Sequence, residues 1–362
     1  MPVDTPKVLA AAAFESGYRE KSRSMIEPSP KMALPMVLAL ATALVTACTP
    51  TSRGGPWVTT YGRDHELVGT IVDVRRQQAV SEAELAARLA EADVVLLGEK
   101  HDNEDHHRLQ AHVVDLLAPE VDALVFEMMT LDQQQLIVEY LAAKPGDTEG
   151  LGPALRWSES GWPDWRMYKP IADAALAQGA QIVAGNIDRS TGERLMNEGI
   201  GSLSESVVQR LGLAQPLPTP YEEELVRELS ESHCGYAPRD RLAGMLLVQR
   251  SRDAMMADRL AALTGDGTSV LVAGAGHVRN DWGVPLYLHE LLPDKRVVSL
   301  AFLEVIGKDE TLPVDLPYDY VWFTPRVQPV GYDPCAAFRN SLQQMEARAP
   351  GDARTSATRS GA

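Results

Sequence analysis

Four groups of polar side chains follow apolar runs along this chain, and their types could bind a metal ion, exchange protons or hold a polar ligand. In chain order the groups are Glu99 with His101, then Glu127, then Asn186, then His277. Carboxylates and imidazoles are common metal ligands and proton carriers near neutral pH. Because each group stands directly after an apolar run, we expect the four to meet in one site.

Two of these groups share a pattern of an apolar run, a glycine, two further residues and a histidine. The pattern occurs at Gly98–His101 and again at Gly274–His277. Glycine lets a chain turn sharply where a strand ends. In a plainer interpretation the polar residues only cap helices and satisfy turn backbone, and this is favoured for Asp102 and Asn103, which precede a predicted helix.

The elements that would position these residues alternate between short apolar strands and helices. Strands are predicted at residues 67–73, 93–97, 123–126, 181–184, 269–273 and 296–303, and helices at 81–91, 104–117, 131–142, 165–178, 239–263 and 285–291. This alternation predicts an α/β fold, with a mostly parallel central sheet and helices on both faces. Ligands of such sheets bind beyond the carboxyl ends of the strands, which is where the polar groups fall.

Composition divides the chain into several parts. We expect an N-terminal extension with a signal peptide over residues 1–48, a linker over 49–62, one α/β domain over 63–345 and a disordered tail over 346–362. Residues 195–239 are predicted to form a helical insertion in that domain.

The segment before Cys48 is typical of an export signal. Residues 32–47 are almost wholly apolar and follow Lys31, but they are fewer than the roughly 20 residues that cross a bilayer as a helix. The ending Val45-Thr46-Ala47-Cys48 resembles a bacterial lipobox, which predicts cleavage before Cys48 and lipidation of Cys48. An uncleaved signal anchor and cleavage without lipidation are the alternatives.

The overall composition excludes several classes of protein. The chain has 362 residues, and its 45% of hydrophobic residues exclude disorder throughout. The 34 Lys and Arg against 50 Asp and Glu give a net charge of −16, which argues against a nucleic-acid partner. Without residues 1–48, 29 basic and 46 acidic residues remain, a net charge of −17.

The three cysteines form no CxxC pair, which argues against a Cys-type zinc site and against covalent haem attachment. In an exported protein Cys234 and Cys335 would meet an oxidising space and could form a disulfide. That bond would close a loop of about 100 residues, worth up to roughly 4.7 kcal/mol in the chain-entropy model. Two unrelated buried thiols are the alternative.

Several motifs together resemble those of the ChaN-like haem-binding lipoproteins. The first is Leu97-Gly98-Glu99-Lys100-His101-Asp102-Asn103, followed by His106-His107-Arg108-Leu109-Gln110. The others, in order, are Phe126-Glu127, residues 162–170, Asn186-Ile187-Asp188-Arg189, His233-Cys234-Gly235, Gln249 with Arg252-Asp253, Gly274-Ala275-Gly276-His277-Val278 with Gly283-Val284-Pro285, Asp319-Tyr320-Val321-Trp322-Phe323 and Asp333-Pro334-Cys335. The resemblance spans residues 67–338 and extends to a wider superfamily with the Tiki and TraB proteins and the erythromycin esterases.

This resemblance implies a lipid-anchored, outer-membrane haem-binding protein of the bacterial envelope, facing the periplasm or the surface. It further implies a role in iron or haem acquisition or storage beside other uptake components, a tyrosine ligand to the iron, and a possible homodimer. Tyr168 is the tyrosine we expect to bind iron, since it lies in a matched stretch; the alternative is that it packs on its helix. His106 and His112 are expected on a solvated face. The expected haem-binding residues are Tyr168, His101, His107, Trp162, Asn186, Arg252 and His277.

The same residues also allow a metal-dependent hydrolase of peptidase or esterase type. Glu99, His101 and His277 would hold a divalent cation, and Glu127 would act as the catalytic base. A third alternative is an exported interaction protein whose site is vestigial. We expect haem binding and keep the hydrolase as the alternative.

Overall fold

A computed structural model describes residues 57–117, 121–265, 267–307, 315–336 and 339–340. The predicted signal peptide, the lipidation of Cys48 and the predicted tail over 346–362 lie outside these residues. Within the described ranges, no helix is both long enough and apolar enough to cross a membrane.

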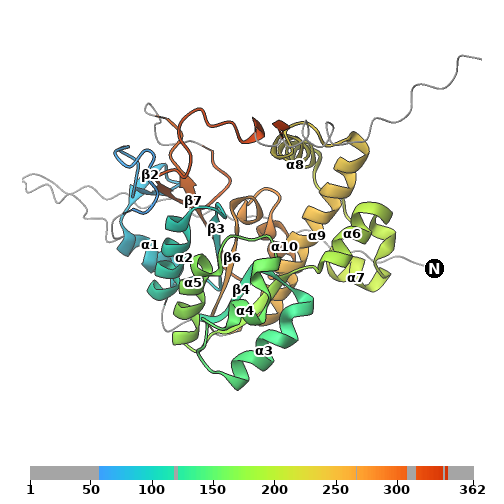
Figure 1. Ribbon diagram of the computed structural model, residues 1–362, viewed down its shortest axis with the longest axis horizontal. Helices are drawn as coiled ribbons and strands as arrows, with labels where there is room; N and C mark the ends of the chain where they lie inside the picture. The colour runs from blue at the N-terminus through green and yellow to red at the C-terminus, as the bar shows by residue number, and fades with distance from the viewer. Residues whose placement is uncertain (1–56, 118–120, 266, 308–314, 337–338, 341–362) are drawn as a thin grey trace, which may run out of the picture. The chain divides into compact units, whose positions relative to one another are not determined.

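A sheet of eight strands forms the centre of the fold (Figure 1). Its order is β2-β1-β8-β7-β3-β6-β4-β5. The strands are β1 (Ile71–Asp73), β2 (Gln78–Val80), β3 (Val94–Glu99), β4 (Val121–Thr130), β5 (Gln181–Asn186), β6 (Thr268–Gly274), β7 (Val297–Glu304) and β8 (Tyr320–Thr324). From β8 to β5 all neighbours pair in parallel, and β1 and β2 add an antiparallel edge. The predicted mostly parallel sheet is therefore confirmed.

That antiparallel edge differs from the expected strands. The first expected strand, 67–73, is reduced to β1, because Gly69 adopts a left-handed φ of 83° and interrupts the extended backbone. β2 was not expected, since its three residues are half-buried or exposed and form no apolar run. β8 was also not expected as a strand, although all five of its residues are buried between β1 and β7.

Helices cover both faces of the sheet (Figure 1). α1 (Glu82–Leu89), α2 (Glu104–Leu116) and α5 (Trp165–Ala177) pack on one face, and α9 (Arg239–Leu263) and α10 (Val284–Leu291) pack on the other. The remaining helices are α3 (Gln134–Ala143), α4 (Leu151–Ala154), α6 (Arg189–Glu198), α7 (Glu205–Arg210) and α8 (Thr219–Ser232). Ser81 closes a capping box with Glu84 at the start of α1, which fixes where that helix begins.

Alternate residues of each central strand enter two separate cores. In β3, Val95 and Leu97 pack toward α2 and α5, whereas Val94 and Leu96 pack toward α9 and α10. Each fully buried side chain of this kind contributes about 1.5–3 kcal/mol by leaving water. Burial on both faces explains why these strands are continuous apolar runs in the sequence.

A disulfide joins Cys234, just after α8, to Cys335 near the C-terminus, as expected for an oxidised pair. The two residues lie 101 positions apart in the sequence, with a Cα–Cα distance of 5.6 Å. Figure 1 shows the result: the C-terminal segment, in red, runs past the end of β7 to the end of α8. The bond thus fixes this segment beside the carboxyl edge of the sheet.

Candidate functional site

The carboxyl ends of β3, β4 and β6 bring the polar groups together. Glu99 pairs in register with Gly274 of β6, and the Gly274 N–H donates to Oε2 of Glu127 at 2.7 Å. We call the resulting set the buried cluster. It consists of Glu99, His101, His107, Glu127, Asp253 and His277.

Both glycines of the repeated pattern serve close packing and not a sharp turn. Neither has a positive φ, and both lie within strands. A Cβ on Gly98 would lie 2.2 Å from Cγ2 of Val278, and a Cβ on Gly274 would lie 3.0 Å from Nε2 of His101. The expectation that glycine turns the chain is thus corrected: the absent side chains let the two strand ends and His101 approach one another.

One half of the cluster centres on Glu99, whose side chain is fully buried. Its Oε1 accepts a hydrogen bond from Nδ1 of His101 at 2.8 Å, and its Oε2 lies 2.7 Å from Nδ1 of His107. Burial by itself would raise the pKa of Glu99, but His107 and His101 outweigh it and lower that pKa. The carboxylate is therefore an anion held between two histidines.

The other half centres on Glu127, which is buried beneath Arg252 and His277. Its Oε1 accepts from Nη2 of Arg252 and lies 3.2 Å from Nε2 of His277. The opposite ring nitrogen of His277 contacts Oδ1 of Asp253. Burial opposes ionisation of Glu127, yet His277 and Arg252 hold its pKa well below the ordinary value. His277 is thus a cation between two carboxylates.

The structure brings the expected haem-binding residues into one neighbourhood. Asn186 donates through Nδ2 to the Glu127 carbonyl at 3.0 Å and accepts from Nε of Arg252 at 3.3 Å. Trp162 lies edge-on to the ring of His101, with centroids 4.8 Å apart. His101 and Arg252 are partly exposed, at 34% and 23% of their side-chain areas, whereas His277 is only 7% exposed. The polar strand ends therefore do meet in one cluster, and most of that cluster is buried.

Tyr168, the tyrosine expected to bind iron, is fully buried. Its ring packs on His107 with centroids 4.3 Å apart, and its hydroxyl donates to Glu99 at 3.4 Å. Burial, reinforced by the charge of Glu99, raises the pKa of the phenol. As the structure places it, Tyr168 is a protonated core residue whose hydroxyl faces a carboxylate.

The expected metal set does not form a common site. His101 pairs with Glu99, whereas His277 pairs with Glu127 and Asp253. Among the described residues no group of three or more His, Cys, Asp or Glu side chains is arranged to hold a metal ion. The arrangement is one of separate buried His–carboxylate pairs, which does not favour the hydrolase alternative.

We expect stability to fall as the pH rises from about 6.5 to about 9. Burial alone would lower the pKa of His277, but Glu127 and Asp253 raise it from 6.5 to about 9. The folded protein thus holds a proton on His277 that the unfolded chain releases near pH 6.5. The resulting stabilisation of the folded state is complete below pH 6.5 and is lost as the pH rises to about 9. It amounts to about 3 kcal/mol. Free energies of unfolding in urea, measured across this pH interval, test the prediction. His277→Gln should remove most of the dependence of the unfolding free energy on pH. An unchanged pH dependence in this variant would contradict the assignment to His277.

A second feature, which the sequence did not predict, lies at the carboxyl edge of β7. It is a cavity of about 570 Å³, here named the apolar hollow. Three large apolar or aromatic side chains stand unusually exposed around it: Ile306 at 74%, Val330 at 69% and Tyr332 at 48%. Lys100 and Arg326 supply its cations. The only sequence signal was indirect, since Tyr332 directly precedes the matched Asp333-Pro334-Cys335 motif.

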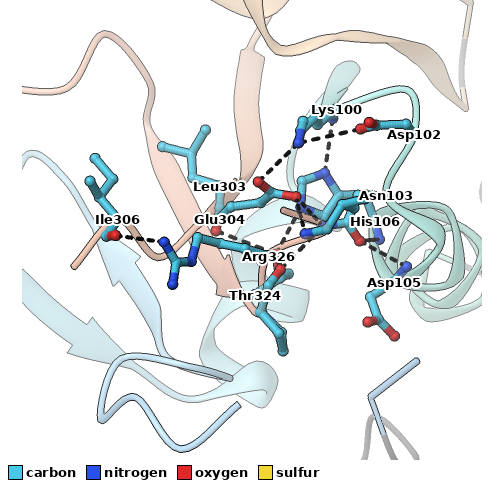
Figure 2. A network of polar contacts seen from close by, with 12 residues as sticks. Lys100, Asp102, Asn103, Asp105, His106, Leu303, Glu304, Ile306, Thr324 and Arg326 are labelled. Atoms are coloured by element: carbon cyan, nitrogen blue, oxygen red, sulfur yellow. Dashed lines mark hydrogen bonds and ion pairs between the residues drawn. The ribbon is translucent and has the colours of Figure 1, made fainter. Parts of the chain in front are cut away.

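A polar network adjoins the hollow (Figure 2), and it shares Lys100, Asp102, Glu304 and Arg326 with the lining of the hollow. Glu304 accepts from Lys100 at 3.0 Å and from Asn103 at 2.9 Å, and Asn103 also caps α2, as its plainer interpretation predicted. His106 was expected on a solvated face but is fully buried. Its neutral ring accepts the Lys100 N–H at 2.9 Å, and burial lowers its pKa well below the ordinary value. His106 therefore joins the start of α2 to the Lys100 backbone, just after β3, and to Thr324 of β8.

Comparisons with known proteins agree with this architecture. The family described as haem-binding uptake, Tiki superfamily, ChaN matches residues 85–288. The solved structure of ChaN of Campylobacter jejuni, described as showing cofacial haem binding, aligns with a TM-score of 0.54 at 23% identity, covering 70% of this chain and 95% of that one. That likeness shows the fold.

Two further solved structures align less well. The type III effector HopBA1 has a TM-score of 0.38 at 13% identity, covering 67% of this chain and 91% of that one. An erythromycin esterase mutant in its open conformation has a TM-score of 0.36 at 16% identity, covering 66% and 77%. A search of curated proteins finds no match. The family match covers more than half of the chain and contains every member of the buried cluster, and we conclude that the chain belongs to the ChaN family of the Tiki superfamily, a family of haem-binding uptake proteins.

Proposed function

We propose that this protein binds haem in the apolar hollow, as a lipid-anchored protein of the bacterial envelope that serves iron or haem acquisition or storage. The observation that carries the proposal is the group of exposed side chains Ile306, Val330 and Tyr332 around one cavity. Exposed apolar side chains gathered around a hollow are typical of ligand sites. Membership of a haem-binding family supports haem as the ligand.

The residues of the hollow fit haem in size and in chemistry. Its volume of about 570 Å³ lies within the range of small-molecule sites, about 300–1,000 Å³. Ile306 and Val330 provide apolar walls for the macrocycle. The Tyr332 hydroxyl has no hydrogen-bond partner among the described residues, so its oxygen is available to a ligand. Bound haem would supply a ferric iron, for which a phenolate is a known axial ligand.

Tyr332 therefore replaces Tyr168 as the tyrosine that we assign to the iron. Moving Tyr168 out of its core would break its contact with Glu99 and empty the space beside Trp157 and Trp165. Filling that space is worth about 3–5 kcal/mol for an aromatic side chain. Tyr332 would bind the iron without such a cost, because about half of its surface already faces solvent.

Envelope location rests on the sequence of the first 48 residues and on the disulfide. Cys48 would carry the lipid, and the Cys234–Cys335 bond is of a kind that persists in oxidising compartments. Anchoring by lipid needs no basic face on a chain whose net charge is −16. The partners that fit are other components of haem or iron uptake and, as the resemblance implies, a second copy of the chain.

A hemin titration of the full chain tests haem binding. We expect the Soret band of hemin to shift and to saturate near a simple stoichiometric ratio. Ile306→Asp places a charge in the hollow and should weaken binding roughly tenfold or more. The matched control is Leu136→Asp, which changes an exposed leucine of α3 and should leave the titration unchanged. No Soret shift at near-stoichiometric hemin would refute the proposal.

A further inference from the structure

Arg326 lies in the wall between two neighbouring cavities. It follows β8 and lines the apolar hollow on one side. On the other side it lines a cavity of about 690 Å³, here named the neighbouring hollow, whose lining includes the basic Arg63 and His65 and the acidic Asp64 and Glu66. The two cavities share Val305, Arg326 and Val330 as lining residues. A side chain in this position can reach a ligand in the apolar hollow.

The guanidinium of Arg326 carries a charge that no carboxylate balances among the described residues. Its Nη1 donates to the Ile306 carbonyl oxygen at 2.9 Å. Its Nε is buried and has no hydrogen-bond partner among the described residues. Arg63 resembles it, because within the described ranges that guanidinium also donates only to backbone carbonyls, those of Thr59 and Val58. A buried donor without an acceptor is unfavourable, so the wall offers a place for an anion.

Glu304, the carboxylate of the polar network, makes no ion pair with Arg326, because both of its oxygens already accept hydrogen bonds from other groups. Glu304 accepts from Asn103 and from the Val327 N–H, both at 2.9 Å through Oε1, and from Lys100 at 3.0 Å through Oε2. Figure 2 shows the Arg326 guanidinium pointing toward Ile306 and away from Lys100. Lys100 is balanced by Glu304 and, at 3.4 Å, by Asp102. Among the residues that the structure describes, Arg326 is therefore the cation of the apolar hollow that has no carboxylate partner.

We infer that Arg326 binds a carboxylate of the ligand, a haem propionate, and thereby sets which edge of the macrocycle faces the neighbouring hollow. This inference rests on the proposed function. Haem is apolar over most of its surface and carries its two propionates on one edge, which matches an apolar cavity with one unbalanced guanidinium in its wall. Arginine pairs with carboxylates through two parallel hydrogen bonds. Arg326 is a positioning residue, since iron binding is assigned to Tyr332.

The test compares hemin with hemin dimethyl ester, in which both carboxylates are blocked. We expect the wild-type full chain to bind hemin more tightly than the ester by roughly ten- to a hundredfold. Arg326→Gln should weaken hemin by the same factor and leave the ester unchanged, so that the variant no longer distinguishes the two. The matched control is Arg189→Gln, which changes an arginine that is 92% exposed and paired with Glu193.

The outcomes separate this inference from the proposed function. Tight binding of both ligands to the wild type and to Arg326→Gln alike would overturn the inference and leave haem binding intact. Absence of hemin binding by the wild type would overturn both. Should Arg326→Gln not fold, the preference of the wild type for hemin over its ester decides the question, together with Arg326→Lys, which keeps the charge and should keep part of that preference.

Discussion

Replacement of Tyr332 by phenylalanine should abolish the ferric phenolate charge-transfer band of the haem complex and weaken hemin binding by roughly a hundredfold or more. The substitution removes only the hydroxyl group, so the apolar wall remains. Because that hydroxyl has no partner among the described residues and the side chain is 48% exposed, the free energy of unfolding should stay within about 0.5 kcal/mol of the wild type. Absorption spectra and hemin titrations of the purified variant measure both effects.

The matched control is Tyr168→Phe, which removes the same atom from the buried tyrosine. It breaks the hydrogen bond to Glu99 and should lower the free energy of unfolding by about 1–2 kcal/mol. It should leave the haem spectrum unchanged. The opposite result, with the charge-transfer band lost in Tyr168→Phe and kept in Tyr332→Phe, would show that the iron binds at the buried cluster.

The second large effect is expected at Glu127. Glu127→Gln removes the anion that balances Arg252 and His277 in the buried cluster. Removing one partner of a buried ion pair lowers the free energy of unfolding by about 3–5 kcal/mol, because the remaining charges are left uncompensated. Urea unfolding should show this loss, and titration of the variant should show a lower pKa for His277.

Glu159→Gln provides the comparison, since Glu159 pairs with Arg156 on the surface with both side chains more than half exposed. Such a pair is worth about 0–1 kcal/mol. Folded Glu127→Gln should also still bind hemin, because Glu127 lies in the buried cluster and not in the apolar hollow. Equal stability of the two variants would contradict the description of the cluster as interdependent ion pairs, and loss of hemin binding by folded Glu127→Gln would contradict the separation of the two sites.

Much of the fold could be predicted because the central strands are buried on both faces. Val94 to Leu97 form an unbroken apolar run since two cores receive alternate residues. The meeting of the polar strand ends followed from parallel pairing alone. The short strands β1, β2 and β8 could not be predicted so well, because their extent is set by neighbours distant in the sequence and, for β1, by the left-handed φ of Gly69.

The site was harder to predict because burial and pairing depend on tertiary packing. For Tyr168 the sequence did carry a signal: with Trp165, Ile171 and Ala175 it forms a stripe at helical spacing, which indicates the core face of α5. The sequence contained almost no signal for the apolar hollow. Residues from β7, the segment after β8 and the first motif after β3 assemble it, and the disulfide holds the segment near Cys335 in place.

The most direct test of the central claim is the position of the iron in crystals of the hemin-loaded protein, measured by anomalous scattering at the iron edge. A haem in the apolar hollow predicts an anomalous peak beside the Tyr332 hydroxyl, with a propionate at Arg326. A peak beside His101 and Tyr168 would contradict it.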